Sequence, residues 1–218
     1  MSKTLICIPC MDFVQTAFVQ SLLGLKTVGE TACSFQTSTL IYDARNHLVE
    51  EAVKGGFDRI LFLDSDMTFG SDTMERLSAR LDEGYDIVSA LYFRRKPPLK
   101  PVVFKQIGYI KDGEAYRPVT ISYDDYPKNS LFEVKGMGFG CVMMKTEIAD
   151  KVAEQYRLPF SPAMGFGEDL SFCIRLSELG IKMYCDSSIK CGHVSQRIIT
   201  EEDYIKMTEG KDGKAGNR

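Results

Sequence analysis

The sequence predicts an α/β protein built on a doubly wound, mostly parallel sheet. Three observations lead to this prediction. Short apolar runs alternate with helical patterns through the first two thirds of the 218 residues, an order typical of strands joined by right-handed helical crossovers. The run Ile60-Leu61-Phe62-Leu63 is apolar on both faces, like a central strand of a parallel sheet. After Pro97-Pro98 the pattern changes to short strands, which predicts a small antiparallel β insertion.

The residues before Pro97 supply most of the predicted sheet. Strands are predicted at residues 4–9, 35–41, 60–63 and 86–93, and helices at 13–23, 43–54 and 71–81. The strand at 35–41 has the weakest pattern because it is rich in Thr and Ser. Asp43 is placed to cap the second helix, and Gly55-Gly56 to end it.

The rest of the chain adds shorter strands and two strong helices. Strands are predicted at residues 102–104, 106–110, 116–122, 132–135, 140–144 and 182–185, with a hairpin turn at 111–114. Helices are predicted at 146–156 and 169–179. No linker divides the chain, so residues 1–200 are predicted to form one domain, and the polar residues 201–218 to be partly disordered.

Composition excludes several classes of protein. Hydrophobic residues make up 44% and charged residues 26%, as in ordinary globular proteins. A net charge of -3 gives no global attraction to nucleic acid or anionic lipid. No apolar run reaches the roughly 20 residues of a membrane span, and the run at 4–9 is too short for a signal peptide. The seven scattered cysteines favour a reducing compartment, so a cytoplasmic protein is expected.

The strongest indication of chemistry is Asp64-Ser65-Asp66, directly after the most hydrophobic strand. On an extended segment, two carboxylates two residues apart face the same way, and ligands of such sheets bind beyond the carboxyl ends of the strands. Hard oxygen ligands of this kind suit Mg²⁺ or Mn²⁺, which can bridge a diphosphate. The alternative is a pair of solvated turn acids.

Two later motifs add to this prediction. Glu168 and Asp169 open a helix, whose dipole is predicted to keep Asp169 ionised near neutral pH. Helix capping alone would also explain these acids. His193 follows Gly192 in a predicted loop after the strand at 182–185. A lone histidine is more often structural than a metal ligand, so this motif gains weight only beside the other two.

In combination, the motifs resemble the catalytic set of nucleotide-sugar glycosyltransferases of the GT-A fold. The resemblance is closest to family 2 and to short phage and prophage glycosyltransferases, and it covers most of the chain. Residues 1–200 would then form one GT-A-like catalytic domain. Each motif is weak alone, but their order and spacing are fairly specific. In chain order they are Ile8-Pro9-Cys10, Asp43-Ala44-Arg45-Asn46, Asp64-Ser65-Asp66, Gly138-Phe139-Gly140, and Glu168-Asp169 with His193.

The resemblance implies a metal site and a catalytic base. Asp64 and Asp66 would bind Mn²⁺ or Mg²⁺, with His193 as an additional ligand from late in the chain. Asp169 would be the general base of an inverting transfer, and Glu168 its catalytic neighbour.

The resemblance also implies a site for a nucleoside-diphosphate sugar donor. Gly138, in the glycine-rich stretch 136–140, would let the backbone approach the donor sugar or the acceptor closely, although a flexible loop is equally compatible with these glycines. The residues expected to bind the donor are Pro9, Cys10, Arg45, Asn46, Asp64, Ser65, Asp66 and Gly138.

The predicted function is therefore metal-dependent transfer of a sugar from this donor. A UDP-sugar is favoured and a GDP-sugar is the alternative, because residues 37–39 are Thr-Ser-Thr where many uridine-binding members carry an acid. Inversion is favoured, but retaining enzymes of this fold share the same acidic motif and late histidine. The acceptor is open among a protein, a glycan, a lipid-linked sugar and a modified DNA base.

Two other functions fit parts of the sequence. Residues 61–68 resemble the nucleophile motif of haloacid-dehalogenase-type phosphatases, with Asp64 as nucleophile but Met67 in place of a glycine. A non-catalytic module that binds a sugar nucleotide is the other alternative.

Arg94-Arg95-Lys96 follows a strand end and is either a phosphate-binding segment or a solvated basic turn.

Overall fold

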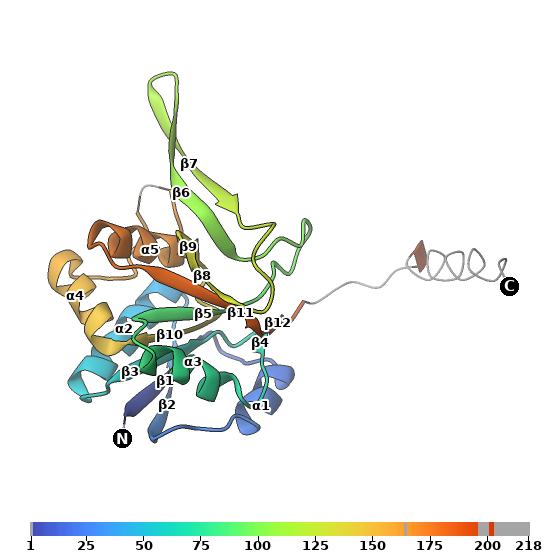
Figure 1. Ribbon diagram of the computed structural model, residues 1–218, viewed down its shortest axis with the longest axis vertical. Coiled ribbons are helices and arrows are strands. Elements are labelled where there is room, and N and C mark those ends of the chain that lie inside the picture. Colours follow the sequence, from blue (N-terminus) through green and yellow to red (C-terminus); the bar gives the residue numbers. More distant parts are fainter. Residues whose placement is uncertain (1, 164, 196–200, 203–218) are drawn as a thin grey trace, which may run out of the picture.

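A seven-stranded sheet runs through the described part of the protein (Figure 1). The computed structural model describes residues 2–163, 165–195 and 201–202. β10 and β8 run antiparallel to their neighbours, and the other five strands point the same way. The predicted α/β fold with a mostly parallel sheet is confirmed. The strand order is β2 (Glu30–Thr37), β1 (Lys3–Cys10), β3 (Arg59–Leu63), β10 (Cys141–Lys145), β5 (Ile87–Leu91), β11 (Met183–Lys190) and β8 (Leu131–Val134).

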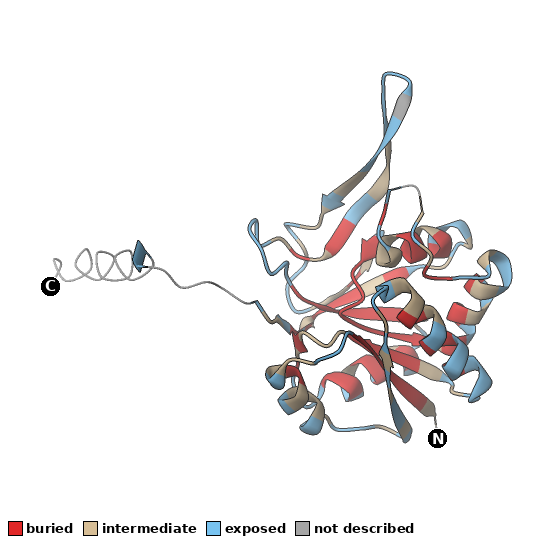
Figure 2. Cartoon of the chain, turned by 180° about the vertical axis from the view of Figure 1, so that it is seen from behind, coloured by how far each residue is buried: buried red, intermediate tan, exposed pale blue. Residues whose placement is uncertain are grey.

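Helices cover both faces of this sheet. Ile60 and Phe62 of β3 point into one layer of the core, and Leu61 and Leu63 into the other. All four are fully buried, which explains why this strand is apolar at every position (Figure 2). The first layer is completed by α2 (Ile41–Lys54), α4 (Thr146–Tyr156) and α5 (Glu168–Glu178), and the second by α1 (Thr16–Leu23) and α3 (Thr73–Asp82).

The second strand and the second helix both begin earlier than predicted. β2 starts at Glu30 rather than at residue 35, and Ile41 opens α2 instead of ending a strand. β2 lies at the edge of the sheet, so its residues are partly exposed and give no continuous apolar run. Leu40 is the N-cap of α2, which leaves Asp43 in the first turn and not at the cap.

The last strand of the main sheet is longer than predicted. β11 continues to Lys190, although the sequence pattern predicts a strand only to Cys185. Asp186 and Ser187 are almost completely buried, and polar residues at buried positions hide the strand from a pattern based on hydrophobicity. α1 also differs from prediction, since it begins at Thr16 and not at residue 13.

The predicted antiparallel insertion is a projecting hairpin (Figure 1). β6 (Val103–Asp112) pairs with β7 (Ala115–Ser122) on one side and with β9 (Gly136–Met137) on the other. The sequence predicts two strands within β6, but a bulge between residues 104 and 106 joins them into one. Gly113 provides the predicted turn with a φ of 63°.

A two-stranded ribbon joins two distant parts of the chain. β4 (Met67–Thr68) pairs with β12 (Gly192–His193), and the pairing sets His193 opposite Met67. Residue 192 must be small, because a Cβ there would lie 2.4 Å from the hydroxyl of Thr68. The ribbon brings the late histidine to the segment that follows β3.

Two expectations concern regions outside the sheet. Among the described residues, no helix combines the length and the apolar character that a membrane span requires. The segment predicted to be partly disordered, 201–218, lies outside the described residues except for 201–202.

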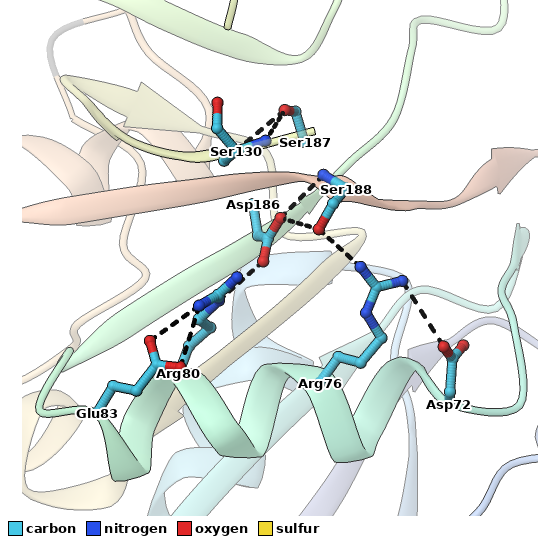
Figure 3. A network of polar contacts seen from close by, with 8 residues as sticks. All are labelled: Asp72, Arg76, Arg80, Glu83, Ser130, Asp186, Ser187 and Ser188. Atoms are coloured by element: carbon cyan, nitrogen blue, oxygen red, sulfur yellow. Dashed lines mark hydrogen bonds and ion pairs between the residues drawn. The ribbon is translucent and has the colours of Figure 1, made fainter. Parts of the chain in front are cut away.

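A polar network ties α3 to β11 (Figure 3). Asp186 is only 1% exposed, and it accepts hydrogen bonds from Arg80 Nε and the Ser188 backbone N–H, both at 2.9 Å. Arg76 donates to the Ser188 hydroxyl at 2.6 Å, and Arg80 also pairs with Glu83. Burial opposes the charge on Asp186, but its hydrogen bonds with Ser188 and Arg80 outweigh burial and lower its pKa.

Asp186→Ala is expected to lower the free energy of unfolding by about 3 kcal/mol at pH 7, because Ser188 and Arg80 lose a buried charged acceptor. The folded-state pKa of Asp186 is lowered. Its contribution is therefore present above the unfolded pKa of about 3.9 and is lost as the pH falls through the folded value. Urea unfolding at several pH values measures both effects.

Asp72→Ala is the matched control. Asp72 lies at the other end of the same network, is exposed, and pairs with Arg76 at 3.7 Å. Its loss is expected to change stability by less than about 0.5 kcal/mol. Equal destabilisation by the two substitutions would contradict a special role for the buried acid.

Candidate active site

A cavity of about 670 Å³ opens at the carboxyl ends of β1 and β3. This is the edge of the sheet at which open α/β folds bind ligands. Its lining combines acids and bases with exposed apolar side chains. The charged residues are Arg45, Asp64, Asp66, Arg95, Lys96 and Glu168, and the others are Pro9, Cys10, Met11, Phe13, Gln15, Ser38, Thr39, Ile41, Ser65, Val194 and Ser195.

Arg45 places a buried positive charge at this cavity. Its side chain, on the inner face of α2, is only 2% exposed. Nη2 pairs with Asp64 at 2.8 Å and Nε with Glu168 at 3.4 Å. Burial opposes the charge, but the two carboxylates outweigh burial and raise the pKa of Arg45. The guanidinium also lies 5.3–5.9 Å from the centres of three aromatic rings, those of Phe62, Phe139 and Phe160.

The sequence predicts that Asp64 and Asp66 face the same way on an extended segment. In the structure they do not. The Met67 N–H donates to the Asp64 carbonyl at 3.0 Å, so residues 64–67 form a turn. The Asp64 carboxylate pairs with Arg45, whereas the Asp66 carboxylate pairs with Arg95 and His193. The two acids line one cavity but have different partners.

His193 lies in the β12 strand and not in a loop. Its Nδ1 is 3.0 Å from the Phe93 carbonyl oxygen, which can only accept, so Nδ1 carries a proton. Nε2 lies 3.3 Å from Asp66 Oδ2. The hydrogen bond with Asp66 raises the pKa of His193. Burial would raise the pKa of Asp66, but His193 and Arg95 outweigh burial and lower it.

The Asp66–His193 pair fits a divalent cation. A metal-binding histidine normally donates its other ring N–H to a carbonyl or carboxylate, as Nδ1 of His193 does. Nε2 of a neutral ring would then direct a lone pair at the Asp66 carboxylate, an arrangement that a shared cation stabilises. Mg²⁺ is typically held by one or two carboxylates together with substrate phosphates, so two protein ligands suffice.

Asp64 is not part of this pair. Among the described residues, no three His, Cys, Asp or Glu side chains gather as a ready metal site. The predicted set of Asp64, Asp66 and His193 is thus brought together only in part, because Arg45 already binds the Asp64 carboxylate. Burial raises the pKa of Asp64 even though Arg45 opposes that shift.

Glu168 and Asp169 begin α5, as predicted, after Gly167 at the N-cap. Glu168 turns toward Arg45 and lines the cavity. Asp169 accepts the Leu170 N–H at 2.7 Å. Burial, and next the charge of Glu168, raise the pKa of Asp169 to about 6. Burial therefore shifts this pKa against the direction that the helix dipole favours, although the ionised form still predominates at pH 7.

The other predicted donor-binding residues divide into two groups. Pro9, Cys10 and Ser65 line the cavity. Asn46 and Gly138 are not among the lining residues, and each has a structural partner instead.

Asn46 and Gly138 both serve the packing around the cavity. The Asn46 side-chain oxygen accepts the Phe160 N–H at 2.9 Å, which fixes one of the rings around Arg45. A Cβ at residue 138 would lie 2.1 Å from the Tyr92 hydroxyl, so this glycine admits Tyr92. The hydroxyl in turn accepts the Gly140 N–H at 3.2 Å. Residues 136–140 are buried, which excludes the flexible loop considered from the sequence.

Sequence reasoning missed the apolar part of the lining. Met11 and Phe13 are exposed although they follow a strand that is buried from Thr4 to Cys10. Apolar residues directly after a strand end, where ligands of such sheets bind, are the sequence signal that could have identified them. The sequence left Arg94-Arg95-Lys96 open between a phosphate-binding segment and a solvated basic turn. It gave no indication of the ion pair between Arg95 and Asp66.

Comparison with known proteins identifies the fold. No protein-family model matches the sequence, and no curated protein matches it. Among solved structures, the crystal structure of A197 from STIV is similar, with a TM-score of 0.64 and 22% identity over 90% of this chain and 87% of that chain. GalNAc-T7 with UDP, GalNAc and Mn²⁺ is also similar, with a TM-score of 0.59 and 10% identity over 90% of this chain.

The fold is glycosyltransferase-like. The match spans 43% of the GalNAc-T7 chain, so this protein corresponds to less than half of that structure. At these identities the similarity concerns the fold alone, which agrees with the mixed α/β sheet and the small antiparallel sheets.

Arg45→Met is expected to lower the free energy of unfolding by about 3–5 kcal/mol at pH 7, because it leaves two partly buried carboxylates without their shared cation. Arg45 opposes the rise that burial causes in the pKa of Asp64, so without the guanidinium the folded-state pKa of Asp64 rises further. An acid with a raised folded-state pKa contributes stability at low pH that is lost as the pH rises. The loss in unfolding free energy caused by Arg45→Met should therefore be smaller at pH 5 than at pH 7. Urea unfolding at both pH values measures the difference.

Arg59→Met provides the comparison. Arg59 is also largely buried, but it pairs with the exposed Asp82 and with Ser78. Its loss leaves no buried carboxylate, so a cost near 1 kcal/mol that is equal at both pH values is expected. An Arg45→Met deficit that does not depend on pH would rule out the proposed electrostatic cause.

Proposed function

We propose that the protein is a metal-dependent glycosyltransferase that transfers a sugar from a nucleoside-diphosphate donor to an acceptor. The observation that carries the proposal is the meeting of Asp66 and His193 beside the cavity, with Nε2 3.3 Å from the carboxylate. A divalent cation bound by this pair would act as a Lewis acid and neutralise the charge that develops on the departing diphosphate. The glycosyltransferase-like fold, shared with GalNAc-T7 in its structure with UDP, GalNAc and Mn²⁺, supports the proposal.

The lining of the cavity suits both halves of a donor nucleotide. Arg95 and Lys96 bring positive charge to the side where Asp66 lies, which favours a diphosphate. Met11 and Phe13 present apolar surface on which the flat face of a nucleobase can pack.

A UDP-sugar is the favoured donor and a GDP-sugar the alternative. The lining at the end of β2 offers the hydroxyls of Ser38 and Thr39 rather than a carboxylate. A hydroxyl both donates and accepts hydrogen bonds, so it discriminates less strictly between bases than an acid would.

Asp169 is the proposed general base, and inversion is the favoured outcome. A pKa of about 6 leaves the group ionised at neutral pH yet able to accept a proton. The acceptor oxygen would attack the anomeric carbon while its proton passes to Asp169. The electron pair of the broken sugar–phosphate bond would leave with the nucleoside diphosphate. Glu168, held by Arg45, would keep the neighbouring position negative and so favour proton uptake.

The two alternative functions are less well supported. A phosphatase nucleophile must be free to attack, but the Asp64 carboxylate is engaged by Arg45 at 2.8 Å. A non-catalytic binding module has no need for an acid with a pKa of about 6 directly after Glu168, a residue of the cavity lining. Slow hydrolysis of the donor distinguishes the proposed enzyme from such a module.

Binding of UDP is expected to require Mn²⁺, because the acids of the cavity repel a diphosphate that carries no cation. Calorimetry in EDTA should give an affinity at least about tenfold weaker than calorimetry with Mn²⁺.

His193→Ala should lose most of this metal dependence without a change in melting temperature. His47→Ala is the control, since His47 is exposed and pairs with Asp43 on the surface of α2. Equal UDP affinity with and without Mn²⁺ would argue against the metal role.

Asp169→Asn is expected to reduce turnover by about 10²–10⁴-fold with nearly unchanged UDP affinity, because it removes a general base and preserves its shape. Hydrolysis of UDP- and GDP-sugars with Mn²⁺ is the assay, and the wild-type rate should fall as the pH drops through about 6. Glu147→Gln, in the first turn of α4, is the control and should have no effect. A product that keeps the anomeric configuration of the donor would exclude the simple base role.

A further inference from the structure

We propose that Arg95 is an internal counter-ion that occupies the cation position on Asp66 until metal and diphosphate arrive together. Each ligand alone would then bind weakly, and each would promote the binding of the other. This inference rests on the proposed function, since it assumes a divalent cation at Asp66 and a diphosphate beside it. It assigns to Arg95 a positioning role in donor binding that the sequence left open.

The first observation is that two groups share one carboxylate oxygen. The Arg95 guanidinium forms an ion pair with Asp66 Oδ2, and His193 Nε2 lies 3.3 Å from the same atom. Oδ2 is the Asp66 oxygen that faces His193 Nε2, so a cation held by both residues would bind at this oxygen. The guanidinium therefore stands where the cation would bind, and it must leave before the cation can enter.

The second observation is that hydrogen bonds hold the backbone around Arg95, whereas its side chain is half exposed. The Ser195 hydroxyl donates to the Arg95 carbonyl at 3.1 Å, and His193 Nδ1 binds the Phe93 carbonyl at 3.0 Å. The Arg94 N–H donates to the Lys100 carbonyl at 3.0 Å. The Arg95 side chain is 52% exposed. Rotation about its side-chain bonds can thus move the charge while the backbone stays in place.

The third observation concerns charge. Arg95 and Lys96 line the same cavity as Asp66. A divalent cation that arrives alone must displace a guanidinium and then remain near it, and two positive charges repel each other. A diphosphate gives the released guanidinium a new partner and brings further ligands to the metal. The displacement therefore favours joint binding over binding of the metal alone.

Thermodynamic linkage makes this inference quantitative. If UDP tightens Mn²⁺ binding by some factor, Mn²⁺ must tighten UDP binding by the same factor. Removal of Arg95 should reduce that factor, because the substitution removes both the competitor of the metal and the partner of the diphosphate. An Arg95 that served only as a surface ion pair would leave the factor unchanged.

The test is calorimetric titration of the full chain with Mn²⁺ alone and with Mn²⁺ in the presence of saturating UDP. Arg95→Ala is expected to tighten binding of Mn²⁺ alone by roughly fivefold, the range of a single exposed ion pair. The ratio of the two Mn²⁺ dissociation constants should fall by about tenfold or more. Arg95→Lys retains the charge without the planar guanidinium and should fall between wild type and Arg95→Ala.

Arg94→Ala is the matched control. It removes the same charge from the neighbouring residue, which is exposed and is not part of the cavity lining. Its binding constants should equal those of the wild type. Equal behaviour of Arg94→Ala and Arg95→Ala would overturn the inference while leaving the proposed function intact. Absence of Mn²⁺-dependent UDP binding in the wild type would instead overturn the proposed function, and the inference with it.

Discussion

The buried charge of Arg45 is the interaction on which the cavity depends. A guanidinium away from water needs partners, and it has two carboxylates from different elements together with three surrounding aromatic rings. Through these contacts Arg45 connects α2 with the end of β3 and the start of α5. Asn46 reinforces the arrangement, because it holds the backbone of Phe160, one of the three rings.

The second constraint is the ribbon between β4 and β12. It brings His193 to Asp66 across 127 positions of sequence and fixes the ring through the Phe93 carbonyl. Tyr92 lies beside this histidine, with ring centres 5.6 Å apart, and its hydroxyl reaches the glycines at 138 and 140. The glycines therefore belong to the support of the histidine rather than to a flexible loop.

The acids around the cavity illustrate how environment separates chemically similar groups. Asp64 is buried against Arg45, Asp66 is shared by His193 and Arg95, and Asp169 is raised to a pKa of about 6 by burial and by Glu168. Divergent environments of this kind would let the proposed cation bind at Asp66 while Asp169 serves as the proposed base. Composition and spacing alone do not distinguish the three aspartates, because burial and partner charges decide their pKa values.

The sequence by itself determined the features that depend on local periodicity. These are the alternating strands and helices, the two-faced apolar strand 60–63, the acids that follow it, and Glu168-Asp169 at a helix start. Tertiary structure decided the partners. Arg45 meets Glu168 across 123 positions, and Arg95 meets Asp66 only because separate strand ends come together at one edge of the sheet. Periodicity reports which face of an element is buried, but it carries no information about which side chain of another element that face will meet.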